Sequence, residues 1–391
     1  MKIRLSGPRG WMSGLLFGAL GAGLIFASAA MAGPQTKKTG AAKAPGKAAG
    51  EQPKFKAIWE PVNFKQDIGL TDVHFVNDTT GWASGAKGTL IKTTDGGDTW
   101  TVILGGDPAG SEEPIRDLRF LDATHGWATK YQRGGKLLRT TDGENWEEFG
   151  KIGEHFGFYY DFIFLTEQIG VQLVKEGNDI ARTTDGGKTW KVVADGCAVN
   201  AEVEGLSRKL GCIRKSFFFL SPESGYAIGA TIPGTNMALF RTEDGGMTWT
   251  PQVVPDVGHP DESHFEQWLY FTDANSGFAV LPRADKFLAT SDGGKTWRGV
   301  IASVKGPLKF AAQVGWSFDQ YGKWTYTTDG GKRWASTQLR LPAYVKAYSL
   351  PSPQRGYVVG EHGMVYRYRI VPVEYSSKGM LPAPMMPAKS P

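Results

Sequence analysis

Six aspartates of this 391-residue chain stand in nearly the same local sequence, which raises the question of catalysis or metal binding. Each follows Thr, Ser or Glu, precedes Gly, and has a Trp four or five residues further on. Paired carboxylates act as acid and base in glycosidases. Six near-identical sites in one chain cannot all be active centres, so we assign them a structural role. The pairs are Asp95 and Trp100, Asp142 and Trp146, Asp185 and Trp190, Asp244 and Trp249, Asp292 and Trp297, and Asp329 and Trp334.

The sequence around each aspartate is that of a tight turn. The carboxylate accepts hydrogen bonds from turn amides, and the following Gly supplies the positive φ that a reversal needs. A short apolar strand precedes the turn, as in Thr89–Lys92, and the Trp opens the next strand, as in Trp100–Ile103. We expect a β-hairpin whose Trp closes the turn from beneath. This motif resembles the Asp-box, or BNR repeat, of sialidases and other β-propellers.

Three other patterns suggest ligand sites, but their context argues against each. None of the Asp turns has the Glu that closes a twelve-residue Ca²⁺ loop. The GGKT segments Gly186–Thr189 and Gly293–Thr296 lack the upstream Gly of a phosphate-binding loop, whose place is taken by Arg182 and Ala289. His259–His264 contains two His on a Pro-containing stretch without metal-ligand spacing, which is typical of a solvated loop. We therefore expect no metal and no cofactor.

The intervals between the six aspartates are 47, 43, 59, 48 and 37 residues, which indicates a repeat architecture. Each unit has a hydrophobic strand that usually ends in Phe, then a Gly followed in most units by an aromatic residue, a further strand, and the Asp-box hairpin. In unit one these parts are Asp72–Phe75, Gly81–Ala83, Leu90–Lys92 and Trp100–Leu104. Four strands in each unit and almost no helical periodicity predict an all-β fold, a β-propeller.

A seventh unit lacks the turn and the fourth strand. It consists of Ala347–Leu350, Gly356–Val359 and Met364–Arg369, whereas Lys56–Val62 near the other end of the chain is a lone strand that contains Trp59. We expect the N-terminal strand to complete this last blade, because such closure removes exposed sheet edges. The prediction is a seven-bladed propeller; six blades are the alternative if the last unit is a cap.

The ends of the chain read as an export signal and flexible segments. Basic residues precede an apolar run that ends in an A-x-A pattern, so residues 1–32 are interpreted as a secretory signal peptide, with an uncleaved membrane anchor as the alternative. No Cys follows this run, which argues against a lipoprotein. Residues 33–54, rich in Ala, Lys and Pro, predict a linker, residues 55–371 the propeller, and residues 372–391 a disordered tail. The form of the signal suggests a bacterial periplasm.

The net charge of +5 comes from the segments outside the propeller. Between residues 57 and 371, acidic side chains outnumber basic ones by 37 to 33. A nucleic-acid-binding body would be basic, so that class of function is disfavoured. The lysine-rich linker could contact an anionic membrane surface weakly, although a solvated linker is the simpler reading.

Cys197 and Cys212 are the two cysteines, and both fall in what we expect to be one long loop between repeats. In an exported protein this pattern predicts a disulfide that contributes about 3 kcal/mol to stability.

Candidate binding residues follow from aligning the units on the residue that ends strand one. The position four residues earlier should open the innermost strand at the mouth of the central funnel, where we expect positive charge. The alternative is an ordinary solvated strand end. Aromatic residues in connecting loops, His155–Tyr160 and Phe318 with Tyr321, would bind protein if exposed and would only pack blades if buried. The candidate partner-binding residues at the aligned position are Arg116, Tyr160, Lys215 and Lys346, and Arg214 and Lys309 are candidates because they lie nearby.

The repeated V-x-F, Gly-Trp-Ala and T-T-D-G-G-x-T-W segments resemble the photosystem II stability/assembly factor family of plants and cyanobacteria. The resemblance spans residues 57–371 and implies a seven-bladed, lumenal or periplasmic, non-enzymatic protein that holds a membrane-protein precursor through a basic patch. Arg116, Lys215 and Lys346 would be the matching charges.

Two rival functions share the Asp-box. A sialidase-like glycoside hydrolase needs an arginine triad, a Tyr–Glu pair and an acid Asp, and the F/Y-R-I-P opening of such enzymes is absent, since Pro114-Ile-Arg116 has the wrong order. A G-x-S-x-G elbow is also missing. A glycan-binding propeller is the third alternative.

Overall fold

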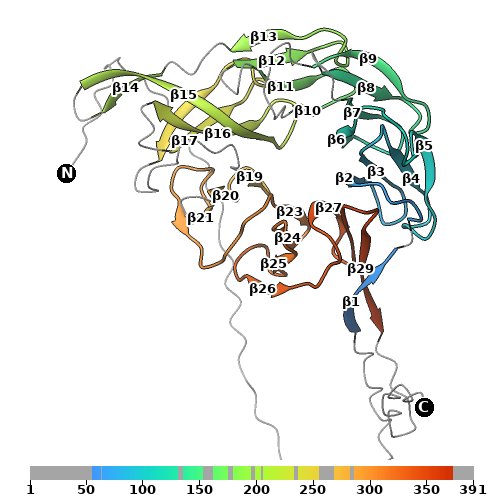
Figure 1. The fold of residues 1–391 in the computed structure, drawn as a ribbon. Coiled ribbons are helices and arrows are strands. Elements are labelled where there is room, and N and C mark those ends of the chain that lie inside the picture. The colour runs from blue at the N-terminus through green and yellow to red at the C-terminus, as the bar shows by residue number, and fades with distance from the viewer. Residues whose placement is uncertain are drawn as a thin grey trace, which may run out of the picture. The chain divides into compact units, whose positions relative to one another are not determined.

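The structure, a computed structural model, describes residues 55–62, 64–130, 135–152, 162–174, 179–194, 199–203, 206–232, 237–254, 268–281 and 286–372. All of them belong to the unit Pro53–Pro391. Every regular element within these ranges is a β-strand, and the strands form seven antiparallel sheets (Figure 1). Each sheet corresponds to one repeat unit and is called a blade.

The strands of the first four blades follow chain order. Blade one has β2 (Leu70–Phe75), β3 (Gly81–Gly85), β4 (Leu90–Thr93) and β5 (Thr101–Leu104); blade two has β6 (Ile115–Phe120), β7 (Gly126–Lys130), β8 (Lys136–Thr140) and β9 (Glu147–Lys151). Blade three has β10 (Phe162–Phe164), β11 (Gly170–Val174), β12 (Asp179–Thr183) and β13 (Lys191–Ala194). Blade four has β14 (Val199–Val203), β15 (Leu206–Phe219), β16 (Gly225–Ile232), β17 (Met237–Thr242) and β18 (Thr250–Val254).

The last three blades end with the closure of the chain. Blade five has β19 (Trp268–Phe271), β20 (Gly277–Leu281), β21 (Lys286–Thr290) and β22 (Arg298–Gly299); blade six has β23 (Lys309–Ala311), β24 (Val314–Phe318), β25 (Lys323–Thr327) and β26 (Ala335–Gln338). Blade seven has β27 (Val345–Ser352), β28 (Arg355–Gly360), β29 (Val365–Pro372) and β1 (Phe55–Pro61).

Antiparallel strands in chain order give each blade two distinct ends. One end carries the turns between the first and second strands and the Asp-box turns, and we call it the Asp-box face. The other end carries the turns between the second and third strands and the connections between blades, and we call it the connection face. The first strand of each four-stranded unit, which is β15 in blade four, therefore starts at the connection face.

Seven hydrophobic clusters hold the blades together, one for each pair of neighbours. The cluster of Trp82, Ile115 and Leu118 joins blades one and two, and equivalent clusters join each following pair. The seventh, with Phe75 and Tyr357, joins blade seven to blade one. Seven interfaces for seven blades make a closed ring, so the predicted seven-bladed propeller is confirmed and the six-bladed alternative is wrong.

The recurrent Gly, aromatic and Phe residues of the repeat are explained by these interfaces. The aromatic residue of the second strand lies against the Phe that ends the first strand of the next blade, and that Phe meets the Asp-box Trp of its own blade edge to face, as Phe120 meets Trp146 at 5.7 Å. The Gly is needed because a Cβ at Gly81 would overlap the ring of Phe75. The ring centroids are 3.9 Å apart for Trp82 and Phe120, 3.8 Å for Trp127 and Phe164, 3.7 Å for Tyr226 and Phe271, 5.4 Å for Phe278 and Phe310, and 3.5 Å for Tyr357 and Phe75.

The Asp-box turns have the predicted hydrogen bonds. In blade one, Asp95 accepts from the Thr99 amide at 2.9 Å and the Thr99 hydroxyl at 2.6 Å, and the Gly97 amide donates to the Thr93 hydroxyl at 2.9 Å. Gly96 and Gly97 have φ values of 71° and 87°. The hydrogen bonds from Thr99 lower the pKa of Asp95 to about 2. The Asp-box Trp side chains are partly buried, whereas the fully buried Trp residues lie in second strands, such as Trp82 and Trp127.

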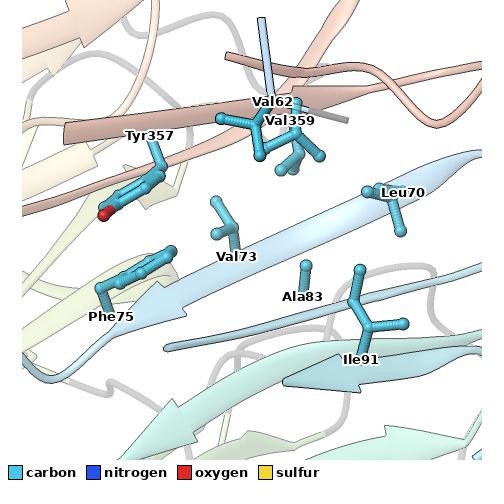
Figure 2. Packing of buried hydrophobic residues seen from close by; sticks show 9 residues of the cluster. Val62, Leu70, Val73, Phe75, Ala83, Ile91, Tyr357 and Val359 are labelled. Carbon is cyan, nitrogen blue, oxygen red and sulfur yellow. The ribbon is translucent and has the colours of Figure 1, made fainter. Parts of the chain in front are cut away.

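The ring is closed by the N-terminal strand, as predicted. β1 pairs with β29 so that Trp59 lies opposite Tyr368, and the Val62 amide donates to the Val365 carbonyl at 2.9 Å. Figure 2 shows the cluster beside this junction, where the rings of Tyr357 and Phe75 lie parallel. The two ends of the propeller are therefore held in one sheet.

Charged groups lock the same junction. The Arg367 side chain, only 11% exposed, lies 2.7 Å from Glu60 and 2.7 Å from Asp98, and it donates to the Gly96 carbonyl at 2.8 Å. Arg369 also pairs with Glu60, at 2.8 Å. We call this network of Glu60, Arg367, Arg369 and Asp98 the clasp. It joins the N-terminal strand, the last strand and the Asp-box of blade one.

Blade four differs from the prediction. The segment between repeats three and four was expected to be a loop, but β14 and β15 form a hairpin in which Val199 pairs with Leu210 and Val203 with Leu206. Apolar residues at alternate positions of β14, namely Val199, Ala201 and Val203, are typical of a strand. Cys197 and the side chain of Cys212 lie outside the described residues, so their disulfide stays a prediction. The same holds for the boundaries of the signal segment, the linker and the tail.

Candidate protein-binding face

Three of the predicted basic residues lie at or near the starts of first strands, on the connection face. Arg116 is the second residue of β6, Lys309 the first of β23 and Lys346 the second of β27, and all three are exposed. The Lys346 ammonium lies 2.8 Å from the Glu361 carboxylate, and both side chains are about two-fifths exposed. We call Arg116, Lys309 and Lys346 the basic mouth.

The remaining predicted residues are placed less simply. Lys215 was expected to open its strand, but β15 starts at Leu206, so Arg214 and Lys215 lie inside it at a register shift. The added hairpin extends the strand beyond the blade and moves its start. The side chains of Arg214 and Lys215, and the whole of Tyr160, lie outside the described residues.

A backbone irregularity accompanies Arg116. The pairing of β6 with β7 shifts between Arg116 and Arg119, which is a β-bulge. Asp117 within the bulge has a φ of 53°, unusual for a residue other than Gly, and its carboxylate accepts from the Thr129 hydroxyl at 2.6 Å. The bulge adds a residue between the two arginines and so changes the direction of Arg116 relative to a regular strand.

The sequence reasoning missed a cluster of charged groups on the first strands. Asp72 on β2 accepts from the Leu118 amide at 2.8 Å and lies 3.7 Å from the Arg119 guanidinium, which in turn donates to the Phe162 carbonyl at 3.3 Å. These contacts link blade one to blade two and blade two to blade three. Charged residues within predicted innermost strands are the signal that could have indicated them.

Burial changes the titration of this cluster. It raises the pKa of Asp72, and the Arg119 charge opposes that shift. It lowers the pKa of His74 to about 3, aided by the charges of Lys309 and Arg119. His74 is therefore neutral at neutral pH. Asp72 and Asp117 lie on the same strands as Arg116 and Arg119 or on a neighbouring one, so acidic and basic side chains are mixed on these strands.

The aromatic residues of blade six behave in two ways. Phe318 is 3% exposed and packs between blades six and seven, whereas Tyr321 is 63% exposed. His155–Tyr160 lie outside the described residues. Tyr344, which the sequence reasoning did not single out, is 51% exposed and lies beside Tyr321.

Two searches of the described residues concern other kinds of site. No three His, Cys, Asp or Glu residues in these ranges are grouped so that they could hold a metal ion. No helix of the described part of the chain has the length and apolar character needed to span a membrane.

Seven blades, Asp-box turns and closure by the N-terminal strand define the class of protein as an Asp-box β-propeller. The family model described as "Photosynthesis system II assembly factor YCF48" matches residues 52–105. The chain is 25% identical over 341 residues to the photosystem II stability/assembly factor HCF136 of Arabidopsis thaliana, covering 79% of each protein. It is 24% identical to the photosystem II assembly lipoprotein Ycf48 of Nostoc sp., covering 80% of this chain and 86% of the relative.

The solved structure "YCF48 bound to D1 peptide" has the same fold, with a TM-score of 0.56 and 20% identity over 80% of this chain and 96% of that one. The resemblance to photosystem II stability/assembly factors that the motifs predicted is therefore confirmed.

Proposed function

We propose that this protein is an exported, non-enzymatic propeller that binds another protein and acts as an assembly factor or scaffold for a membrane-protein client. The observation that carries the proposal is similarity along the whole propeller to proteins named as photosystem II assembly factors, one of which is titled as bound to a D1 peptide. Function on a rigid propeller usually resides on the connections and strand ends, which vary while the blades stay fixed.

We place the client on the connection face, at the basic mouth. Arg116, Lys309 and Lys346 belong to three different blades, so one extended partner segment can contact several of them at once. Their charge is unusual in a propeller whose acidic residues outnumber the basic ones. Tyr160, Arg214 and Lys215 belong to the same proposed surface. Asp72 and Arg119 would support this surface by joining adjacent first strands.

The proposed location is the periplasm of a bacterium. The apolar segment before residue 33 supports export, and the relative from Nostoc is named a lipoprotein. A signal peptide that is cleaved, or an anchor that is kept, would both place the propeller there. Weak contact of the lysine-rich linker with anionic lipid is part of the same proposal.

The experiment is capture of membrane proteins by the immobilised full exported chain from detergent-solubilised membranes of the source organism. We expect a defined membrane protein to be retained and to be lost when Arg116→Glu and Lys346→Glu are combined. Lys191→Glu, an exposed lysine on the outer strand β13, is the matched control. Equal retention by the charge-reversed variant contradicts the proposed site. Turnover of a fluorogenic sialoside or glucoside by the purified chain contradicts the proposed non-enzymatic function.

A further inference from the structure

Blades six and seven carry an exposed pair of tyrosines on the connection face. The ring centroids of Tyr321 and Tyr344 are 5.6 Å apart, and the rings meet edge to face at 78°. Tyr321 lies in the turn between β24 and β25, and Tyr344 ends the connection that leads into β27. Single exposed apolar residues are common on protein surfaces, but two solvent-exposed aromatic rings in contact with each other form a small apolar patch.

The turn that carries Tyr321 is fixed by its own hydrogen bonds. The Asp319 carboxylate accepts from the Tyr321 and Lys323 amides, each at 2.9 Å. Gly322 completes the turn with a φ of 82°, and its amide donates to the Asp319 carbonyl at 3.2 Å. The backbone of Tyr321 is therefore held in one conformation.

The residues at the two ends of the connection between blades six and seven also bind this turn. The Gln338 side-chain amide donates to the Tyr321 carbonyl at 2.6 Å, and the Val345 amide donates to the Gln320 carbonyl at 3.0 Å. The segment that bears Tyr344 is thus tied to the turn that bears Tyr321. An aromatic pair ordered before binding loses little conformational entropy when a partner arrives, and rigid Tyr side chains of this kind are typical anchors of protein interfaces.

The core does not require these two rings. The interface of blades six and seven is filled by other aromatic residues, among them Trp316, Phe318 and Tyr348, which are at most 8% exposed. Removing the Tyr321 and Tyr344 rings should therefore cost little stability, so a binding role can be tested separately from folding.

The charged residues close to the pair in the sequence are mainly basic, although the Lys346 ammonium is paired with the Glu361 carboxylate at 2.8 Å. Lys323 follows Tyr321 by two residues, Lys346 follows Tyr344 by two residues, and Arg340 is exposed in the same connection. The acidic residue within the turn is Asp319, whose carboxylate accepts hydrogen bonds from the two backbone amides named above. Lys346, two residues after Tyr344, also belongs to the basic mouth, so one residue of the mouth lies close to the tyrosine pair in the chain.

We propose that Tyr321 and Tyr344 form an aromatic clamp for an extended, acidic segment of the protein client. Apolar or proline side chains of that segment would lie against the two rings, and its carboxylates would face Lys323, Arg340 and Lys346. This inference rests on the proposed function and specifies the chemistry of the client. A glycan stacking on the rings is the competing occupant.

The test uses an array of overlapping 15-residue peptides from the exported segments of the organism's membrane proteins, spanning net charges of both signs, with neutral oligosaccharides on the same surface. The full exported chain should retain acidic peptides that contain aromatic, aliphatic or proline residues. Combined Tyr321→Ala and Tyr344→Ala should weaken this binding about tenfold or more with an unchanged melting temperature, whereas Tyr321→Phe should keep it. Ile301→Ala, fully exposed in the connection into blade six, is the matched control.

The outcomes separate this proposal from the proposed function. Equal peptide binding by the wild type and the double Ala variant removes the clamp but leaves the protein-binding function standing. Retention of oligosaccharides in place of peptides, or of basic peptides in place of acidic ones, also overturns the clamp. Failure of the wild type to bind any peptide overturns the clamp, and loss of membrane-protein capture as well overturns the function itself.

Discussion

At the scale of single residues, the repeated aspartates act as hydrogen-bond acceptors that shape turns. Each of the six carboxylates accepts a hydrogen bond from the hydroxyl of the Thr that ends the third strand, two residues before the Asp, as Asp95 does from Thr93 at 2.8 Å. The pKa values of the Asp-box aspartates are all lowered, mainly by hydrogen bonds within the turn. The carboxylates stabilise the fold in their charged form.

Replacing Asp95 by Asn should lower stability at pH 7 by about 1 kcal/mol, a modest value because water screens an exposed turn. The folded-state pKa of about 2 lies below the ordinary value of 3.8, so the stabilisation is complete above about pH 4 and is lost as the pH falls toward 2. Urea unfolding of both proteins at pH 7, 4 and 2.5 checks this, with Thr94→Ala as control. A difference that stays constant with pH would contradict the assignment.

His74 gives a second titration with its own pH range. Because its folded-state pKa of about 3 lies below the ordinary 6.5, the unfolded chain binds a proton that the folded chain does not, and stability falls as the pH drops below 6.5. His74→Gln should lose this pH-dependent part of the free energy of unfolding. The stability of the variant relative to the wild type should therefore rise as the pH falls from 6.5 to 4. His125→Gln, in the turn after β6, is the control. Parallel pH profiles for wild type and His74→Gln would count against a neutral His74 imidazole in the folded protein.

At the scale of elements, the aromatic residue of the second strand is the main contact between blades. Trp82 stacks on Phe120, and its indole N–H donates to the Gly143 carbonyl of the next Asp-box at 3.0 Å. Trp127 and Tyr357 make the same kind of bond to the Asp-boxes of blades three and one. Blade three has Val171 at this position, in a cluster with Phe217 and Phe219. The interface between blades three and four therefore depends more on these two Phe side chains than on the residue of the second strand.

Trp82→Ala should therefore destabilise the protein by about 4 kcal/mol and Val171→Ala by about 2 kcal/mol. The larger loss combines a cavity with an unpaired carbonyl in the neighbouring turn. Equilibrium unfolding in urea measures both values. Equal losses at the two positions would show that the stacked aromatic residue does not hold the blades.

The sequence predicts those elements that are encoded by short patterns of neighbouring residues, and it does not predict contacts between residues far apart in the chain. The Asp-box, the Gly-aromatic strand and the terminal Phe are local patterns, so the blades were predictable one by one. The hairpin of β14 and β15 breaks the repeat, and aligning the units therefore misplaced Lys215. The contacts of Asp72 with Leu118 and Arg119, and of Tyr321 with Tyr344, join different strands or connections and depend on register, which no repeat pattern encodes.

At the scale of the whole propeller, the ring is closed by the strand pairing of β1 with β29 and by the clasp. The Glu60 carboxylate accepts hydrogen bonds from both Arg367 and Arg369, and Arg367 also donates to Asp98 of blade one. Glu60→Ala should cost about 2 kcal/mol, because it leaves a largely buried guanidinium with fewer partners. Glu243→Ala, which removes an exposed pair with Arg241, should cost at most about 0.5 kcal/mol. Thermal unfolding checks the order of these effects, and a larger loss for Glu243 would contradict the clasp.

We propose that the closed propeller holds another protein at its basic mouth. This is tested most directly by measuring the dissociation constant of the captured membrane protein for the wild type and for Arg116→Glu. We expect at least about tenfold weaker binding for the variant, an effect that shrinks as salt rises, with no fall in melting temperature. Unchanged affinity for Arg116→Glu, with the fold intact, would contradict it.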